Sequence, residues 1–163
     1  MEIVMKKIKV ISCMITVGIM ALIFFFSSQT QEESARTSGR LIMWFLNCVS
    51  VFLPISDGDM PVLVEALTHV VRKCAHFTIY AALGMSSSVS FRLITGRRYK
   101  TVFLISTVFC MLYAISDEIH QCFSYGRGPQ ATDVLIDTAG AITGFLLLMA
   151  VLGIKKIFGK GSG

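Results

Sequence analysis

The sequence predicts an all-α polytopic membrane protein, a bundle of four transmembrane helices, and three properties of the chain lead to that prediction. The 163 residues are 54% apolar, with a mean hydropathy of +0.70. Only 15% are charged, whereas about a quarter of the residues of a soluble domain usually carry a charge. Four apolar segments also approach the ~20 residues that a helix needs to cross a hydrocarbon core of about 30 Å. These properties argue against a soluble globular domain.

The four spans are expected at about residues 10–26, 74–91, 101–123 and 133–154. Lysines precede the first span, as they would precede a signal peptide, but Phe26 leads directly into Ser27 without a small-residue cleavage site. We therefore interpret this span as an anchor. Residues 1–154 are expected to form one transmembrane domain, and the basic tail of residues 155–163 is expected to be disordered.

The connection between the first two spans is expected to contain two further helical segments. Residues 41–53 are apolar and contain Trp44 but are too short to cross a bilayer, so they predict an interfacial helix. Pro61 suits the first turn of a helix, and apolar residues repeat at helical spacing from Leu63 onward. Since no proline or glycine interrupts this pattern before Gly84, the amphipathic helix is expected to run into the second span.

Lysine and arginine residues predict the orientation of the chain, because cytoplasmic connections of membrane proteins are enriched in them. They cluster before the first span, between the second and the third, and after the fourth. The clusters are Lys6, Lys7 and Lys9; Arg92, Arg97, Arg98 and Lys100; and Lys155, Lys156 and Lys160. Both termini are therefore expected in the cytoplasm. The net charge of +5 is explained by these short clusters, so no nucleic acid is expected as a partner.

Polar residues gather at the outer ends of all four spans. Ionisable groups within a membrane are costly, by roughly 2.5 to 3.5 kcal/mol near a helix centre, and are functional candidates for that reason. Helical spacing places one set of them on a single face of each of the last three spans: Lys73, His76 and Tyr80; Asp117, His120 and Gln121; and Asp133 and Asp137. We expect these faces to meet in a polar pocket open to the outside. The candidate residues are Ser28, Gln29, Lys73, His76, Tyr80, Asp117, Glu118, His120, Gln121, Arg127, Asp133 and Asp137. Gly140 and Gly144 continue the face of the fourth span and predict close helix packing.

Three kinds of chemistry are open to these residues. A mixture of imidazole and carboxylate groups could bind a divalent cation, zinc or manganese rather than calcium. The candidate metal ligands are His76, His120, Asp117 and Asp133. Alternatively, Asp117 or Glu118 could form a proton-transfer pair with His120, while Lys73 and Arg127 hold a phosphate or carboxylate. In a third interpretation the carboxylates only neutralise these two cations.

No cofactor is predicted, since the sequence contains no compact ligand motif. It lacks an HExxH pattern and a glycine-rich phosphate loop. Its five cysteines show no zinc-type spacing. A divalent metal ion therefore remains an alternative only through residues brought together from different spans.

Several motifs in these spans occur together and in a fixed order. They are Phe26–Gln29, Arg72–Gly84 with its Lys-x-x-His-Phe, Asp117–Phe123 with its Asp-Glu-x-His-Gln, Gly126-Arg127, and Asp133–Gly140. On these motifs, which cover most of residues 26–144, the chain resembles the VanZ-like family of small bacterial membrane proteins. It departs from the family pattern slightly: Ser124-Tyr125 replaces the more usual apolar-Pro pair, and Asp137 stands where Asn is also common.

The resemblance implies a multi-pass protein of the bacterial cell membrane. The family takes its name from a protein that gives low-level resistance to teicoplanin, a lipoglycopeptide that acts on lipid-linked wall precursors at the outer membrane face. The resemblance carries no catalytic roles. We expect the outward pocket to bind or act on such a precursor or lipoglycopeptide. Lys73 and Arg127 would bind the anionic groups of this ligand, and the base of the pocket would be formed by the polar side chains of Asp117, Glu118, His120 and Asp133.

Two alternatives stay open beside this expectation. One is a membrane enzyme that acts on an envelope lipid by acid/base or metal-assisted chemistry, and the other is a small transporter. The lipid bilayer is the further expected partner, and the sequence carries no signal of an oligomeric state.

Overall fold

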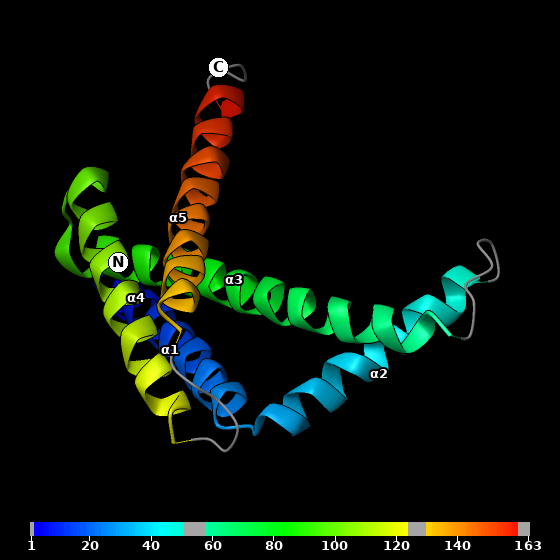
Figure 1. Ribbon diagram of the computed structural model, residues 1–163. Helices are drawn as coiled ribbons and strands as arrows, with labels where there is room; N and C mark the ends of the chain where they lie inside the picture. The colour runs from blue at the N-terminus through cyan, green and yellow to red at the C-terminus, as the bar shows by residue number, and fades with distance from the viewer. Residues whose placement is uncertain (1, 51–57, 124–129, 160–163) are drawn as a thin grey trace.

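The computed structural model describes residues 2–50, 58–123 and 130–159, and this part of the chain is helical and contains no strand. The helices are α1 Glu2–Ser27, α2 Gln31–Ser50, α3 Met60–Thr95, α4 Tyr99–Gln121 and α5 Ala131–Gly159 (Figure 1). The predicted all-α class is confirmed.

Four of these helices are long and apolar enough to cross a membrane, which confirms the predicted number of spans. The segments are Glu2–Ser27, Met60–Thr95, Tyr99–Gln121 and Ala131–Gly153. Many of their large apolar side chains face outward; Phe25, for example, is 63% exposed and Leu104 is 62% exposed. An apolar surface of this extent is unfavourable in water, and it is the surface that lipid solvates.

Helix α3 lies at the centre of the bundle and packs most extensively on α5. Gly140 and Gly144 allow this close packing, because a Cβ atom on either would overlap the backbone carbonyl oxygen of Phe77 or Ala81. Gly84 of α3 approaches the backbone of α5 in the same way. The two helices therefore meet backbone to backbone, as small residues permit in membranes.

The core of the bundle is small and contains buried hydroxyl groups beside apolar side chains. Its apolar part comprises Ile23, Tyr80, Leu83, Cys110, Ala114 and Ala141. Next to it, the Ser88 hydroxyl donates to Ser106 at 2.9 Å, and Ser106 also pairs with Ser87 at 2.7 Å. These hydroxyls satisfy one another's hydrogen-bonding capacity, as buried polar groups require, and they join α3 to α4.

Helix α3 is longer than the second span expected from apolarity alone. It begins at Met60, directly before Pro61, and continues to Thr95 without a break. It ends at Gly96, whose φ of 65° lies in the left-handed region and whose amide donates to the Arg92 carbonyl. The amphipathic segment and the second span are thus one helix of 36 residues.

Helix α2 begins at Gln31, earlier than the apolar stretch 41–53 that predicted a helix here. Thr30 and Glu33 form a capping box at its start. The Glu33 carboxylate accepts a hydrogen bond from the Thr30 amide at 2.9 Å, and the Thr30 hydroxyl accepts one from the Glu33 amide at 3.2 Å. The hydrogen bond from the Thr30 amide, and to a smaller extent the one from the Thr30 hydroxyl, holds the pKa of Glu33 below its ordinary value. Residues 51–53 of the predicted interfacial helix lie outside the described residues.

Helix α5 continues to Gly159. Residues 155–159 are therefore helical rather than part of a disordered tail, since Lys155 and Lys156 favour a helix. Residues 160–163 lie outside the described part of the chain.

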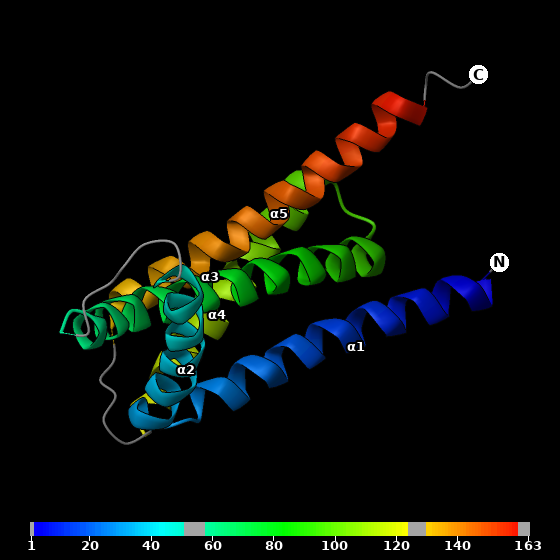
Figure 2. The same cartoon turned by 90° about the vertical axis from the view of Figure 1, so that its right-hand side faces the viewer.

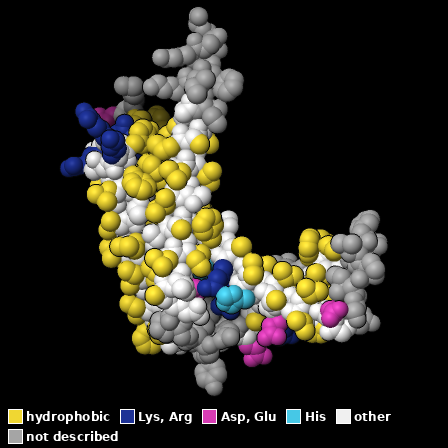
Figure 3. All heavy atoms as spheres, turned by 45° about the horizontal axis from the view of Figure 1, so that its top comes forward, with side chains coloured by type: hydrophobic (Ala, Val, Ile, Leu, Met, Phe, Trp, Pro, Cys, Tyr) yellow, Lys and Arg dark blue, Asp and Glu magenta, His cyan; other side chains and the backbone are white. Residues whose placement is uncertain are grey.

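The two ends of the bundle are formed by different helix ends and connections. Figure 2 shows the start of α1, the α3–α4 connection and the end of α5 at one end, and the start of α2 and of α5 at the other. Lys and Arg side chains gather where α3 meets α4, and apolar side chains cover the length of the bundle (Figure 3). Helix α2 and the first part of α3 project from the bundle and are called the arm below (Figures 1 and 3).

Candidate functional site

Asp117 of α4 lies near the end of that helix, at the end of the bundle opposite the α3–α4 connection. It is 4% exposed, and its Oδ2 atom accepts a hydrogen bond from the Ser27 hydroxyl of α1 at 2.8 Å. The Gln121 side-chain amide, one turn further along α4, donates to the same oxygen at 3.1 Å. Two donors therefore fix the orientation of this carboxylate.

Asp137 of α5 and His76 of α3 face Asp117 from the other side. Asp137 is fully buried, and its Oδ2 atom lies 3.7 Å from Nδ1 of His76. Neither carboxylate oxygen of Asp137 accepts a hydrogen bond from the residues that the structure describes. One potential ligand atom from each of His76, Asp117 and Asp137 lies within 4.8 Å of the others. These three residues form the polar cluster.

Glu118 lies beside Asp117 in α4 but turns toward the start of α5. Its Oε2 atom accepts a hydrogen bond from the backbone amide of Gln130 at 2.8 Å. Its Oε1 atom is buried and has no hydrogen bond within residues 2–50, 58–123 and 130–159. Glu118 therefore holds the start of α5 against the end of α4.

Lys73 and Asp133 pair with each other across α3 and α5. The Lys73 ammonium group donates directly to Oδ1 of Asp133, and both side chains are about three-quarters buried. The charge of Lys73 is therefore neutralised within the protein.

His120 and Ser28 form a second contact between α1 and α4. The Ser28 hydroxyl lies 3.1 Å from Nε2 of His120, and the His120 ring stacks on Phe24 with 4.4 Å between ring centroids. His120 and Asp133, which the sequence suggested as metal ligands, are not among the three residues of the polar cluster.

Tyr80 lies one turn after His76 in α3 and is fully buried. Its hydroxyl has no hydrogen-bonding partner in the described part of the chain. Tyr80 thus closes the polar end of the bundle against the apolar core, in which its ring packs.

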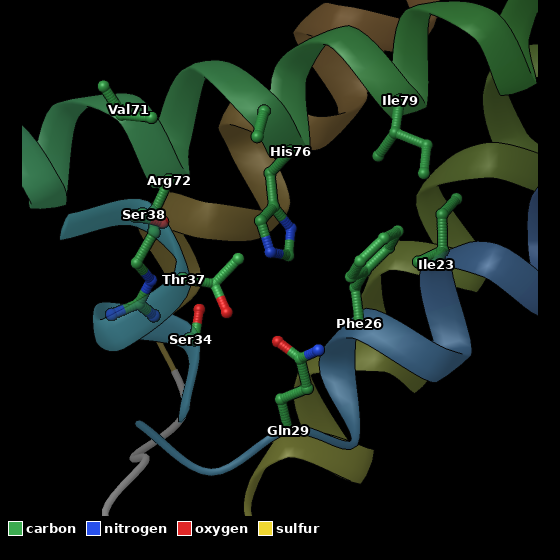
Figure 4. A pocket seen from close by; sticks show the side chains of 11 residues that line it. Ile23, Phe26, Gln29, Ser34, Thr37, Ser38, Val71, Arg72, His76 and Ile79 are labelled. Atoms are coloured by element: carbon green, nitrogen blue, oxygen red, sulfur yellow. The ribbon is translucent and has the colours of Figure 1, made fainter. Parts of the chain in front are cut away.

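A pocket of about 250 Å³ opens between α1, α2 and α3 and is lined in part by His76 (Figure 4). Polar side chains of Arg72 and His76 on α3, Gln29, and Ser34 and Thr37 on α2 line one part of it. The opposite part is lined by Ile23, Phe26 and Ile79. Val71 and Ala75 also line it, so its lining is mainly apolar with several polar groups. We call this cavity the lateral pocket.

The lateral pocket contains residues that the sequence did not single out. Arg72 directly precedes Lys73 and was not among the candidate residues, but its side chain lines this pocket. Ser34 and Thr37 lie in the polar part of α2, which apolarity could not identify as a helix. The Thr30-x-x-Glu33 pattern was the available signal for that helix.

The structure brings together most of the candidate residues. His76, Asp117 and Asp137 meet in the polar cluster, Gln121 and Ser27 support it, and Gln29 lines the adjoining pocket. Lys73 and Asp133 neutralise each other, and Ser28 and His120 pair elsewhere. Arg127 lies outside the described residues.

Two carboxylates and an imidazole at this distance can exchange a proton or bind a cation. Arg72, on the adjoining wall, can bind an anionic group.

A protein-family model described as VanZ/LLP1 matches residues 12–153. No curated protein matches the chain, and no solved structure matches it.

Proposed function

Because the chain belongs to the VanZ/LLP1 family, we propose that it is a cell-envelope membrane protein that binds a lipid-linked wall precursor or a lipoglycopeptide such as teicoplanin. The observation that carries this proposal is the lateral pocket, whose mainly apolar lining also includes the charged side chain of Arg72.

The lining of the lateral pocket suits a ligand with an anionic head and an apolar chain. The Arg72 guanidinium can bind a phosphate or carboxylate through two parallel hydrogen bonds. Ile23, Phe26 and Ile79 offer an apolar wall for the chain. Lipid-linked precursors and lipoglycopeptides both combine these two chemical parts, so one pocket could bind either.

Arg72 takes the role that the sequence suggested for Lys73. Lys73 is paired with Asp133, and breaking that pair to bind a ligand would leave a carboxylate without its counterion. Arg72 lines the pocket, so it can engage an anion without that cost.

The distribution of basic residues supports an outward position for the pocket. The α3–α4 connection, which carries basic residues, lies at the end of the bundle opposite the start of α5 (Figure 2), and Asp137 of the polar cluster belongs to the first turns of α5. If that end is cytoplasmic, as the positive-inside rule predicts, the lateral pocket opens near the outer headgroups.

The binding test uses the purified full chain in lipid nanodiscs, titrated with fluorescently labelled teicoplanin and, separately, with an undecaprenyl-diphosphate-linked wall precursor. Arg72→Gln should weaken binding by at least about tenfold, because a charge-assisted hydrogen bond contributes about 1.5–3 kcal/mol. Arg36→Gln is the matched control, since Arg36 is an exposed arginine of α2 that does not line the pocket. Equal affinities of the wild type and Arg72→Gln for both ligands would contradict the proposal.

A second test measures teicoplanin susceptibility of a deletion strain complemented with each variant at matched expression. Wild type and Arg36→Gln should restore the parental susceptibility, and Arg72→Gln should not. If Arg72→Gln complements fully, the pocket is not the site of any resistance function.

An enzymatic role on an envelope lipid is the second candidate, because His76 both lines the lateral pocket and lies 3.7 Å from Asp137. A buried carboxylate beside an imidazole can act as a general base. A catalytic role predicts that Asp137→Asn abolishes turnover of a bound lipid while its affinity remains. A binding role predicts that affinity changes by degrees and that no product forms with the wild type.

A further inference from the structure

The polar cluster is built by three helices that are far apart in the sequence. His76 comes from α3, Asp117 from α4 and Asp137 from α5, and one potential ligand atom of each lies within 4.8 Å of the other two. All three helices are fixed here by other contacts: the α3–α5 glycine packing and the Ser27–Asp117 hydrogen bond hold them in place. The cluster is therefore a fixed element of the fold.

Asp137 provides a second, independent observation. Its side chain is fully buried, and neither oxygen accepts a hydrogen bond from the described residues. An ionised carboxylate taken out of water costs several kcal/mol unless it is paired and hydrogen-bonded. Nδ1 of the His76 imidazole lies 3.7 Å from Oδ2 of Asp137, which is too far for a hydrogen bond. Asp137 is thus buried without a hydrogen-bond donor to either carboxylate oxygen among the described residues.

We propose that His76, Asp117 and Asp137 bind a divalent cation of the zinc or manganese class. One imidazole nitrogen and two carboxylate oxygens are a donor set that these ions accept. The two negative charges of the carboxylates balance the charge of the ion. The ion would also supply the partner that the Asp137 oxygens lack.

The spacing of the donor atoms fits such an ion. With bonds of about 2.0–2.1 Å, two ligand atoms of a tetrahedral zinc ion lie about 3.3 Å apart. The observed 3.7 Å between Nδ1 of His76 and Oδ2 of Asp137 is close to this value. One potential ligand atom of Asp117 lies within 4.8 Å of both of these residues, so a bound ion would draw the three donors closer together.

Ser27 and Gln121 act as positioning residues for the proposed site. Both donate to Oδ2 of Asp117, which leaves Oδ1 for the ion. Hydrogen bonds of this kind orient metal-binding carboxylates, and removing one typically weakens metal affinity about 10–100-fold.

The proposed ion lies beside the lateral pocket, because His76 belongs to both. Three protein ligands leave one tetrahedral position open, and an oxygen of a molecule in the pocket can occupy it. The proposal goes beyond the proposed ligand binding and does not depend on it, since metal content is measured without any ligand.

The test measures metal content of the full chain purified in detergent. The protein is stripped with a chelator, incubated with Zn²⁺ or Mn²⁺, desalted and analysed by mass spectrometry of the elements. Wild type should retain about one ion per chain, as a specific site does. His76→Ala, Asp117→Asn and Asp137→Asn should lose that ion, and Gln121→Ala should bind it about 10–100-fold more weakly.

Matched controls come from the arm. His69→Ala and Asp59→Asn remove the same residue types from exposed positions of α3 and its N-terminal cap, and both variants should retain the ion. Arg72→Gln should also retain it, which separates this test from the test of ligand binding. Failure of wild type to retain either ion, or equal retention by His76→Ala, overturns the proposal.

A measurement on the wild type alone covers the case in which cluster variants fail to fold. X-ray absorption at the zinc edge should show nitrogen and oxygen ligands at about 2.0–2.2 Å, including imidazole scattering. A sulfur shell at about 2.3 Å would place the ion on cysteines and would overturn the proposal. Thermal unfolding provides a further readout: Zn²⁺ or Mn²⁺ should raise the Tm of wild type and not that of His76→Ala.

Discussion

The Ser27 hydroxyl at the end of α1 donates a 2.8 Å hydrogen bond to Asp117 of α4, a residue 90 positions further along the chain. This bond links the first helix to the polar cluster. Because Ser27 is fully buried and Asp117 is 4% exposed, water cannot easily replace the donor.

Ser27→Ala should destabilise the protein by about 1–3 kcal/mol, since it removes a hydrogen bond to a buried carboxylate. Unfolding in detergent, followed by circular dichroism, measures the change. Ser28→Ala is the matched control and should have a much smaller effect, because Ser28 is exposed. Equal effects of the two variants would show that the Asp117 contact contributes nothing specific.

Gly144→Ala should also destabilise the bundle, by about 1–3 kcal/mol. The added Cβ atom would overlap the Ala81 carbonyl oxygen, so α3 and α5 must separate. Gly153→Ala in the same helix meets no atom within 4 Å and should leave the free energy of unfolding unchanged or raise it slightly. The prediction is wrong if both variants unfold at the wild-type temperature.

Lys73 and Asp133 should show a measurable coupling in a double-mutant cycle. Each single variant, Lys73→Met or Asp133→Asn, leaves a partly buried charge without its partner, while the double variant removes both. We expect a coupling of about 0.5–1 kcal/mol, at the upper end of values for exposed pairs, because both side chains are about three-quarters buried. Strictly additive effects would mean that the ion pair contributes no stability.

The capping box at the start of α2 should weaken in acid. Thr30 lowers the pKa of Glu33 below its ordinary value of 4.5, so its stabilising effect is complete above that value and is lost as the pH falls through the lowered pKa. Hydrogen exchange of the first amides of α2, corrected for intrinsic rates, should show less protection at pH 3 than at pH 6. Glu33→Gln should show weaker pH dependence, and an unchanged pH dependence would contradict this origin.

The orientation of the chain can be tested by labelling single cysteines in a cysteine-free background. A membrane-impermeant maleimide added from outside should label Asp59→Cys at the start of α3 and should not label Arg97→Cys in the α3–α4 connection. Both positions are exposed. The reverse pattern would place the lateral pocket on the cytoplasmic side.

The spans could be predicted because apolarity and length are properties of the sequence alone. The convergence of His76, Asp117 and Asp137 was also predictable, since helical spacing places each on the inner face of its own span. Which of the candidates touch was not predictable, because that depends on helix rotation and crossing angle. Lys73 therefore reaches Asp133, while its sequence neighbour Arg72 lines the lateral pocket.

The start of α2 was not predicted from the sequence, for a different reason. Residues 31–40 are mostly polar and carry no apolar periodicity, so only the Thr30–Glu33 capping pattern marks where the helix begins. The extension of α5 to Gly159 was also not predicted, because basic residues that suggest a tail are compatible with a helix as well.

The unbroken length of α3 has a consequence for the membrane in which the protein works. A helix of 36 residues is about 54 Å long at a rise of about 1.5 Å per residue, whereas a whole bilayer measures about 40–45 Å. The helix must tilt or extend beyond the headgroups, and hydrophobic mismatch decides between the two. The thickness of the host membrane thus sets how far the lateral pocket lies from the water.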